Sequence, residues 1–349
     1  MAELAYASTH LRATVSVVIP NYNHAPYLPQ RIETVLNQTY PVTEVLILDD
    51  CSTDDSRDVI AQYAARDARI RVVLNEQNSG STFRQWNRSF GMASGDYVWI
   101  AESDDAADLR FLETLVGRLE AHPAAGLAYA DSWNMDAKGQ VHGTGRHLLE
   151  ELDSQLFGHS FVLSGRELVR RFMAFRNIVP NASAVVMRRS TLRAVGPAPE
   201  HLRVAGDWWF WVQYFLQTEV VFVAEPLNYF RFHQHNVRTQ TERDGTQLVE
   251  MACVLARVRE VVEPEPVLYQ RAITLLIERW LHALVYHAVP MSRHNKFIET
   301  MGAIEPGFRA RLVRHFSRFL VRNRLSGIKM LLIDKLFGRT KQVISGGSK

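Results

Sequence analysis

Cysteine is almost absent from this sequence of 349 residues, and so are long apolar runs. The two cysteines, Cys51 and Cys253, form neither a disulfide framework nor a zinc-type pair. No segment reaches the ~18 consecutive apolar residues of a membrane-spanning helix. The N-terminal residues lack the basic start and apolar stretch of a signal peptide. We therefore expect a cytoplasmic protein, for which any membrane contact would be peripheral, on the inner face of the membrane.

A large excess of charge of one sign is also missing, because 40 lysines and arginines nearly balance 37 aspartates and glutamates. The formal net charge of +3 is too small to indicate nucleic acid as a partner. A hydrophobic content of 47% and a charged content of 22% are typical of a folded globular protein. The length allows one large α/β domain and a smaller appendage.

Short apolar runs alternate with segments of helical periodicity in the N-terminal part of the chain. Four runs are typical of buried strands: VSVVIP (15–20), EVLILDD (44–50), IRVVLN (70–75) and DYVWIAE (96–102). Their alternation with helices predicts an α/β fold with a mostly parallel sheet flanked by helices. Turn residues at 136–139 predict a hairpin, and residues 143–165 are expected to form a loop. From about residue 245 onwards the pattern is helical.

Polar segments directly follow three of these strands, where ligands bind in open α/β sheets. The segment Glu102-Ser103-Asp104-Asp105 is acidic, and clustered acids repel one another unless a cation or a donor neutralises them. Hard oxygen ligands suit Mg²⁺ or Mn²⁺, which would in turn bind a diphosphate. The alternative is a solvated acidic turn that caps the next helix.

Asp49 and Asp50 end the second predicted strand, where a carboxylate can accept hydrogen bonds from a base or a ribose. Ser52 to Asp55 can cap the following helix without them, which favours ligand contact over capping.

Two further segments carry candidate functional residues. Asp207 lies in GDWWFW, where partial burial among aromatic residues would raise its proton affinity and suit a general base. The alternative for Asp207 is a simple helix cap. Arg231, His233 and His235 alternate along an extended segment and so share one face, from which they could neutralise phosphates or complete a metal shell. A polar edge strand is the alternative for that segment.

The order of these motifs resembles family-two glycosyltransferases of the GT-A fold, over roughly residues 14–240. The matching stretches are VSVVIPNYN, DD-x-S-T-D at 49–54, N-x-G at 78–80, GDYVWIAESDD at 95–105, the Asp207 region and RFHQHN at 231–236. The resemblance implies a metal-dependent, inverting glycosyltransferase of bacterial surface polysaccharide synthesis. It would move a sugar from a nucleoside-diphosphate sugar to a hydroxyl of a glycan or lipid-linked acceptor. Residues 241–349 would form a helical C-terminal region.

The resemblance also implies roles for individual residues. Pro20, Tyr22 and Asp50 would border the nucleoside, and Glu102 would lie near the ribose. Asp104 would bind Mn²⁺ or Mg²⁺, with Asp105 beside it, and His233 would lie near the metal or diphosphate. Asp207 would be the catalytic base. The sequence departs from the family pattern at two positions. Glu102 replaces the first aspartate of the D-x-D motif, and Gly206 replaces the glutamate of the common Glu-Asp pair.

Two other functions are compatible with such a sheet and its acids. A sugar nucleotidyltransferase would normally carry a glycine-rich phosphate loop after the first strand, but PNYNHAPYL contains no glycine. A non-catalytic module that binds a nucleotide sugar would not need the full set of acids, Asp207 included.

Basic residues gather at the C-terminus, where residues 308–341 hold ten lysines and arginines and one acid, Asp334. Phe308, Leu312, Phe316 and Phe319 recur at helical spacing between the arginines. A basic amphipathic helix of this kind can lie on an anionic membrane surface. In the alternative, the apolar stripe packs on the catalytic domain and the arginines are solvated.

Overall fold

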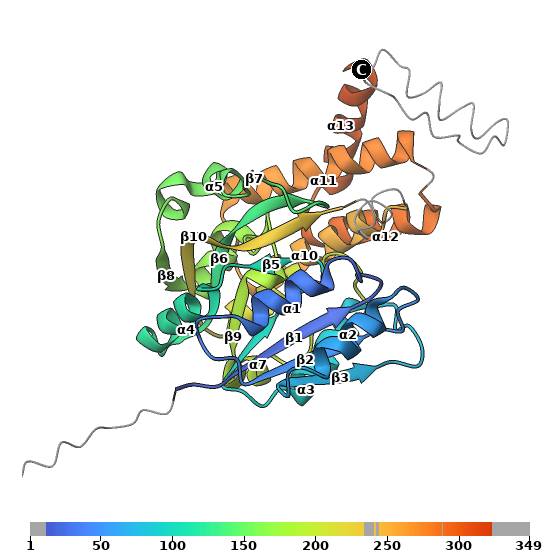
Figure 1. Cartoon of the computed structure of the whole chain (residues 1–349). Coiled ribbons are helices and arrows are strands. Elements are labelled where there is room, and N and C mark those ends of the chain that lie inside the picture. The colour runs from blue at the N-terminus through green and yellow to red at the C-terminus, as the bar shows by residue number, and fades with distance from the viewer. Residues whose placement is uncertain (1–11, 234–240, 242–243, 288, 323–349) are drawn as a thin grey trace, which may run out of the picture. The chain divides into compact units, whose positions relative to one another are not determined.

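The computed structural model describes residues 12–233, 241, 244–287 and 289–322 (Figure 1). It divides into two compact units. The first comprises Met1–Leu163, Val179–Pro197 and Gln217–Phe232, and the second comprises Ser164–Ile178, Ala198–Leu216 and His233–Lys349. The chain therefore passes between the units repeatedly before residue 233. The division at residue 240 that the sequence suggested stays a prediction.

A mixed sheet forms the centre of the first unit (Figure 1). Its strands are β1 (Val15–Asn21), β2 (Glu44–Asp49), β3 (Ile70–Leu74), β4 (Tyr97–Ile100), β5 (Ala106–Ala107), β6 (Ala125–Asp136), β7 (Val141–Thr144), β8 (Phe161–Ser164), β9 (Val185–Arg188) and β10 (Glu219–Phe232). They lie in the order β3-β2-β1-β4-β9-β6-β10-β5, with β7 on β6 and β8 on β10.

The direction of the strands changes along the chain. The pairs β1–β2, β1–β4 and β2–β3 are parallel, as β-α-β connections require. β9 is antiparallel to both β4 and β6, and β7 forms the predicted hairpin with β6. β6 and β10 form a further parallel pair, and β5 is antiparallel to β10. The predicted fold class, an α/β sheet flanked by helices with a helical C-terminal region, is confirmed, and the strands that carry the sequence motifs, β1 to β4, form one parallel group.

Alternation of side chains along the parallel strands assigns helices to the two faces of the sheet (Figure 1). One hydrophobic core joins Val15, Val17 and Ile19 of β1 to apolar residues of α1 (Leu28–Leu36), α2 (Ser56–Ala64) and α4 (Phe111–Ala121). The helix α3 (Thr82–Met92) packs on β1 and β2 and buries Phe83 and Trp86, which are not part of that core. Because β1, β2 and β4 are buried along their whole length, ligands can reach these three strands only at their ends.

The expectation of a loop over residues 143–165 is wrong. This stretch contains the end of β7, the helix α5 (His147–Phe157) and β8. The sequence pattern did not reveal α5 because Asp153 has non-helical backbone angles (φ −162°, ψ 98°). The helical periodicity of the apolar residues is therefore interrupted at Asp153.

The second unit is helical within the described residues. Its helices are α6 (Gly165–Leu168), a π-helix at Val169–Met173, α8 (Gly206–Phe215), α10 (Thr246–Val261), α11 (Pro266–Tyr286), α12 (Met291–Ile304) and α13 (Phe308–Arg322). α11 begins with Pro266 in its first turn, and the Glu265 side chain caps it by accepting a 2.8 Å hydrogen bond from the Leu268 amide. None of the described helices has both the length and the apolar character needed to cross a bilayer.

Candidate active site at the ends of the parallel strands

The loops after β1 and β2 form the edge of the sheet where a ligand is expected. Pro20 is buried within β1, whereas Tyr22 just beyond the strand is 45% exposed. Asn23 (φ 56°) and Cys51 (φ 63°) both adopt left-handed backbone conformations, which are uncommon for residues other than glycine. The Asn23 amide donates to Ser52 Oγ at 3.0 Å, which ties the two loops together. Such local strain concentrates at functional sites.

Asp49 is fully buried, and protein donors hold its carboxylate. It accepts hydrogen bonds from Asn21 Nδ2 (2.9 Å) and the Ser52 amide (3.0 Å), and it pairs with Arg57 Nε (2.9 Å). Although burial opposes ionisation, these hydrogen bonds hold the pKa of Asp49 below its usual value. Asp49 thus braces the strand ends as an anion, and its predicted contact with the nucleotide stays a prediction.

Asp50 holds the N-x-G segment that the sequence singled out. Its Oδ1 accepts hydrogen bonds from Asn75 Nδ2 (2.7 Å), the Ser79 amide (2.8 Å) and Gln85 Nε2 (2.9 Å). Its Oδ2 accepts from Ser79 Oγ at 2.7 Å. Asp50 therefore fixes a loop that reaches the same edge of the sheet as Tyr22.

The acidic segment begins with Glu102, which is half-buried behind α3. Its Oε1 accepts a 2.9 Å hydrogen bond from Trp86 Nε1, and its amide donates to Ser183 Oγ at 3.0 Å. Burial, with the charge of Asp104 as the next cause, raises the pKa of Glu102 to about 8. Ionisation of Glu102 is therefore unfavourable unless a cation or a hydrogen-bond donor of a ligand binds beside it.

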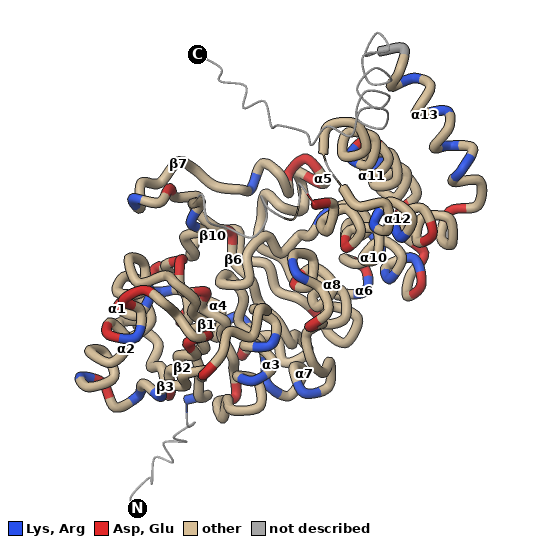
Figure 2. The backbone as a smooth tube through the Cα atoms, turned by 90° about the vertical axis from the view of Figure 1, so that its right-hand side faces the viewer, with Lys and Arg blue, Asp and Glu red and all other residues tan. Residues whose placement is uncertain are grey.

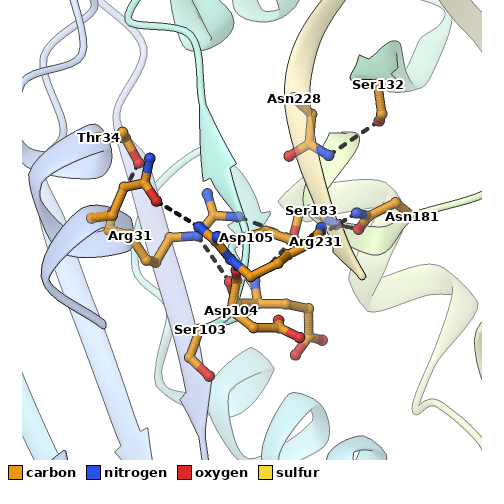
Figure 3. A network of polar contacts seen from close by, with 12 residues as sticks. Arg31, Thr34, Ser103, Asp104, Asp105, Ser132, Asn181, Ser183, Asn228 and Arg231 are labelled. Atoms are coloured by element: carbon orange, nitrogen blue, oxygen red, sulfur yellow. Dashed lines mark hydrogen bonds and ion pairs between the residues drawn. The ribbon is translucent and has the colours of Figure 1, made fainter. Parts of the chain in front are cut away.

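Asp105 lies at the centre of a buried polar network (Figure 3). Its Oδ2 accepts hydrogen bonds from Asn181 Nδ2 (2.8 Å) and Ser183 Oγ (2.7 Å), while its Oδ1 accepts from the Arg231 amide (2.9 Å). Arg31 Nη2 lies 3.9 Å from Oδ2. Burial raises the pKa of Asp105. Protein donors thus surround the Asp105 carboxylate.

Arg31 completes the network from α1. Its Nε donates to the Glu102 carbonyl at 2.8 Å, and its guanidinium lies 5.6 Å from the Trp99 ring. Burial lowers the pKa of Arg31 to about 10, although the surrounding acids act in the opposite direction. One buried arginine is thus held beside three clustered acids.

Asp104 and His24 form the part of this edge that could hold a metal. Asp104 is half-buried, and it and His24 each offer a ligand atom, with the two atoms within 4.8 Å of each other. His24 Nδ1 lies 2.8 Å from Ser103 Oγ. A histidine that binds a metal usually forms a hydrogen bond through its other ring nitrogen, and Ser103 offers the oxygen for one. A carboxylate beside an imidazole suits Mn²⁺ or another divalent cation.

Arg231 of β10 is buried and directed at the acidic segment (Figure 3). Its Nε donates to the Asp104 carbonyl at 2.6 Å, its Nη2 donates to Gln30 Oε1 at 2.5 Å, and its Nη1 donates to the Asp136 carbonyl at 3.2 Å. The guanidinium also lies over the Tyr27 ring, 4.7 Å from its centre. In this arrangement Arg231 holds the Asp104 loop, and its contact with a diphosphate stays a prediction.

Replacing Arg231 by methionine should therefore destabilise the protein. Each partly buried carbonyl left without its donor, that of Asp104 or of Asp136, costs up to ~1–3 kcal/mol of unfolding free energy. Arg110→Met is the matched control. Arg110 is exposed and forms a surface ion pair with Glu225 of β10, the strand that also carries Arg231, and such a pair is worth ~0–1 kcal/mol. Urea unfolding of both variants measures the difference. Equal losses would show that the Arg231 contacts do not hold the Asp104 loop.

The remaining predicted residues belong to the second unit. Asp207 is the second residue of α8, and its Oδ2 accepts a 3.2 Å hydrogen bond from Asn177 Nδ2. His233 follows Phe232, the last residue of β10. The rest of the RFHQHN motif, residues 234–236, lies outside the described residues. Asp207 and His233 therefore keep their predicted roles as predictions.

Sequence reasoning missed several members of this site: His24, Arg31, Asn181 and Ser183. His24 could have been noticed, since it lies in the polar loop after the first strand. Arg31 is hidden in the apolar pattern of α1, and Asn181 and Ser183 lie in a stretch without periodicity. Nothing local signals their contacts, because their partners are ~70 or more residues away and adjacency of that kind is set by tertiary packing.

Comparison with known proteins agrees with this geometry. The sequence profile of glycosyl transferase family 2 matches residues 16–179. A putative teichuronic acid biosynthesis glycosyltransferase, TuaG of Bacillus subtilis, is 42% identical over 97 residues, which are 28% of this chain and 38% of the relative. The match thus spans well under half of that relative.

Solved structures share the fold. The structure of Staphylococcus aureus TarS 1-349 in complex with UDP-GlcNAc aligns over 94% of this chain and 93% of its own, with a TM-score of 0.63 and 16% identity. The mannosyltransferase PcManGT of Pyrobaculum calidifontis, in complex with GDP-Man and Mn²⁺, aligns over 95% of this chain and 89% of its own, with a TM-score of 0.55 and 15% identity. Residues 16–179 therefore belong to glycosyl transferase family 2, and the sheet of the first unit has the GT-A fold.

Proposed function

We propose that this chain is a metal-dependent, inverting glycosyltransferase that moves a sugar from a nucleoside-diphosphate sugar to a hydroxyl of a surface glycan acceptor. The observation that carries the proposal is the acidic segment 102–105, held by buried arginines at the ends of parallel strands on a GT-A sheet. The names of the relatives support this reaction class, since they include a teichuronic acid glycosyltransferase and TarS with UDP-GlcNAc.

Residues at the strand ends would bind the donor. Tyr22 offers an exposed aromatic ring just beyond the end of β1, which suits a nucleobase. Glu102, whose carboxyl is costly to ionise, would lie near the ribose. Pro20 shapes the end of β1 beneath them.

Asp104 would bind the divalent cation, and His24 and His233 are the imidazoles that could join it. A bound Mg²⁺ or Mn²⁺ would compensate the negative charge that grows on the departing diphosphate. We assign Asp105 to positioning rather than to the metal, because protein donors already surround its carboxylate. The mannosyltransferase of the same fold, solved in complex with GDP-Man and Mn²⁺, supports use of a divalent metal.

Asp207 would act on the acceptor. Its carboxylate would take the proton of the acceptor hydroxyl as that oxygen attacks the anomeric carbon from the face opposite the diphosphate. The bond to the new oxygen forms as the bond to the phosphate oxygen breaks, so a single displacement inverts the anomeric centre. This step needs one carboxylate and no covalent nucleophile.

A donor screen tests the proposal. UDP-, dTDP- and GDP-sugars are added to the protein with Mn²⁺, with Mg²⁺ or with EDTA, and the melting temperature and donor hydrolysis are measured. A true donor should stabilise the protein only with metal, by RT ln(1 + [L]/Kd), or ~2.7 kcal/mol at a hundredfold excess over Kd. Stabilisation without any hydrolysis or transfer would support a non-catalytic binding module instead. Release of pyrophosphate from a nucleoside triphosphate and a sugar phosphate would support a nucleotidyltransferase.

We further propose that α13 brings the enzyme to an anionic membrane surface. α13 carries five arginines and no acid (Figure 2). One side packs within its unit: Phe308 is buried against Phe297, and Arg311 donates to Thr274 Oγ1 of α11 at 2.7 Å. The other side exposes Val313, at 65%, among further arginines. Residues 323–341 of the predicted basic tail lie outside the described residues.

Charge reversal on the exposed side should abolish this binding. A basic residue near an anionic leaflet contributes ~1 kcal/mol. The triple variant Arg309→Glu, Arg314→Glu, Arg318→Glu should therefore stop sedimenting with phosphatidylglycerol vesicles in low salt, whereas wild type sediments and is released by high salt.

The matched control reverses three exposed arginines of the first unit, Arg66, Arg118 and Arg193, which changes the net charge equally. If the control loses binding as fully as the α13 variant, total charge rather than α13 is responsible. Sedimentation that is independent of lipid charge would also contradict the proposal.

A further inference from the structure

Glu250 of α10 is a buried carboxylate with no part in the function proposed above. It is 5% exposed and accepts three backbone hydrogen bonds. Its Oε1 accepts from the Arg203 amide at 2.8 Å, and its Oε2 accepts from the Val204 and Ala205 amides at 2.8 and 2.9 Å. These three amides are consecutive and end where α8 begins. The Glu250 side chain thus binds all three residues, 203–205, that directly precede the helix carrying Asp207.

The start of α8 needs such an acceptor. The amides at and before the first turn of a helix have no partner within it, and the helix dipole places partial positive charge there. Ala205, the residue before α8, provides no side-chain cap. Consecutive amides pointing inward make an anion-binding concavity, and here the anion comes from a neighbouring helix (Figure 2).

Two further contacts hold the first turn of α8. Trp208 Nε1 donates to the Met173 carbonyl at 3.1 Å, and Asn177 Nδ2 donates to Asp207 Oδ2 at 3.2 Å. Asp207 thus follows the loop that Glu250 holds, and its carboxylate and the next side chain are each held by one further hydrogen bond. Rotation of the first turn of α8 would move the Asp207 carboxylate, and Glu250 resists that rotation through three hydrogen bonds at once.

We propose that Glu250 is a positioning residue, which sets the direction of the Asp207 carboxylate by fixing residues 203–205. The proposal rests on the proposed role of Asp207 as the base. The sequence lacks the glutamate that usually precedes the base, since Gly206 stands there, and α10 instead brings a carboxylate to the adjoining loop. Glu250 touches neither substrate nor metal in this proposal and acts only through Asp207.

The test is a set of variants at Glu250, measured alone and with Asp207→Asn. Glu250→Gln keeps the size but loses the charge and one acceptor oxygen, while Glu250→Asp keeps the charge on a shorter stem. Turnover should fall by ~10²-fold in Glu250→Gln, the cost of a misplacement of about 1 Å, and less in Glu250→Asp. The affinity for nucleoside diphosphate and metal should stay unchanged. Glu260→Gln is the control, since Glu260 lies on the same helix but is exposed and pairs only at the surface with Arg257.

The double variant separates positioning from a merely structural role. If Glu250 acts through Asp207, Glu250→Gln should lower turnover no further once Asp207 is asparagine. Equal losses in both backgrounds, or a Glu250→Gln enzyme with wild-type turnover, would overturn the proposal. If Glu250→Gln does not fold, the same comparison is made with Glu250→Asp. Full activity of the single variant Asp207→Asn would instead overturn the assignment of Asp207 as the catalytic base.

Discussion

The variant Asp207→Asn should lose ~10²–10⁴-fold of its turnover, the usual contribution of a general base. Asparagine keeps the size and the hydrogen-bonding capacity of the side chain but cannot take a proton at neutral pH. Because Tyr22, Glu102 and Asp104, which are proposed to bind the donor and its metal, belong to the other unit, the affinity for nucleoside diphosphate should stay at its wild-type value. Steady-state kinetics with saturating donor and titration with the free diphosphate measure the two effects separately.

Asp58→Asn is a well-matched control for this experiment. Asp58 also lies in the first turn of a helix, α2, so its replacement removes a similar helix-dipole interaction without touching the proposed chemistry. Turnover in the control should stay within a factor of about two of wild type, because a surface substitution of this kind changes little. A variant that lost donor affinity but kept its turnover would make Asp207 a binding or capping residue. A product that retains the donor's anomeric configuration would exclude the single displacement.

The second large effect is expected at Asp104. Asp104→Asn should abolish metal-dependent binding of the donor, because the carboxylate supplies the charge that a divalent cation requires. The fold should stay intact, since Asp104 is half-buried and the backbone of its loop is held by Arg231. Titration with Mn²⁺ and nucleoside diphosphate, with and without EDTA, measures the loss.

The neighbouring acid provides the contrast. Asp105→Asn should lower the unfolding free energy, because it weakens the ion pair with Arg31 and forces an amide among donors that need an acceptor. Asp104→Asn should thus lose metal binding, whereas Asp105→Asn should lose stability. If Asp104→Asn binds metal and donor normally while Asp105→Asn does not, the two roles must be exchanged.

Much of the catalytic sheet could be predicted from local patterns. The run VSVVIP became β1, EVLILDD became β2 and IRVVLN became β3, each within two residues of the predicted bounds. β1 and β2 are buried on both faces, and a continuous apolar run of that kind is readable without knowing its neighbours. β3 was expected to be buried as well, but it lies at the edge of the sheet and only Ile70 is fully buried. The acids that end these runs were readable for the same reason.

The partners of those acids could not be predicted. Asp49 and Asp50 were expected to face a ligand because the next helix did not need them as caps. Instead, Arg57 of α2 binds Asp49, and the Ser79 amide and Gln85 of α3 bind Asp50. Likewise, Glu250 gives no signal in the pattern of α10, where it is one of several charged residues. Long-range hydrogen bonds satisfy the demands of burial, and those demands are visible only once the chain is folded.

The repeated passage of the chain between the two units bears on how such enzymes can be recombined. α8, which carries Asp207, enters the second unit through the excursion Ala198–Leu216, and it buries Phe210 and Trp211 in a unit completed only by helices after residue 233. A chimaera joined at a single point near residue 240 would combine these aromatic residues with a foreign set of helices. Exchange of the second unit between relatives should therefore give a folded protein only when Ser164–Ile178 and Ala198–Leu216 are exchanged together with the C-terminal helices. Because of this connectivity, we expect the two units to be inherited together in evolution.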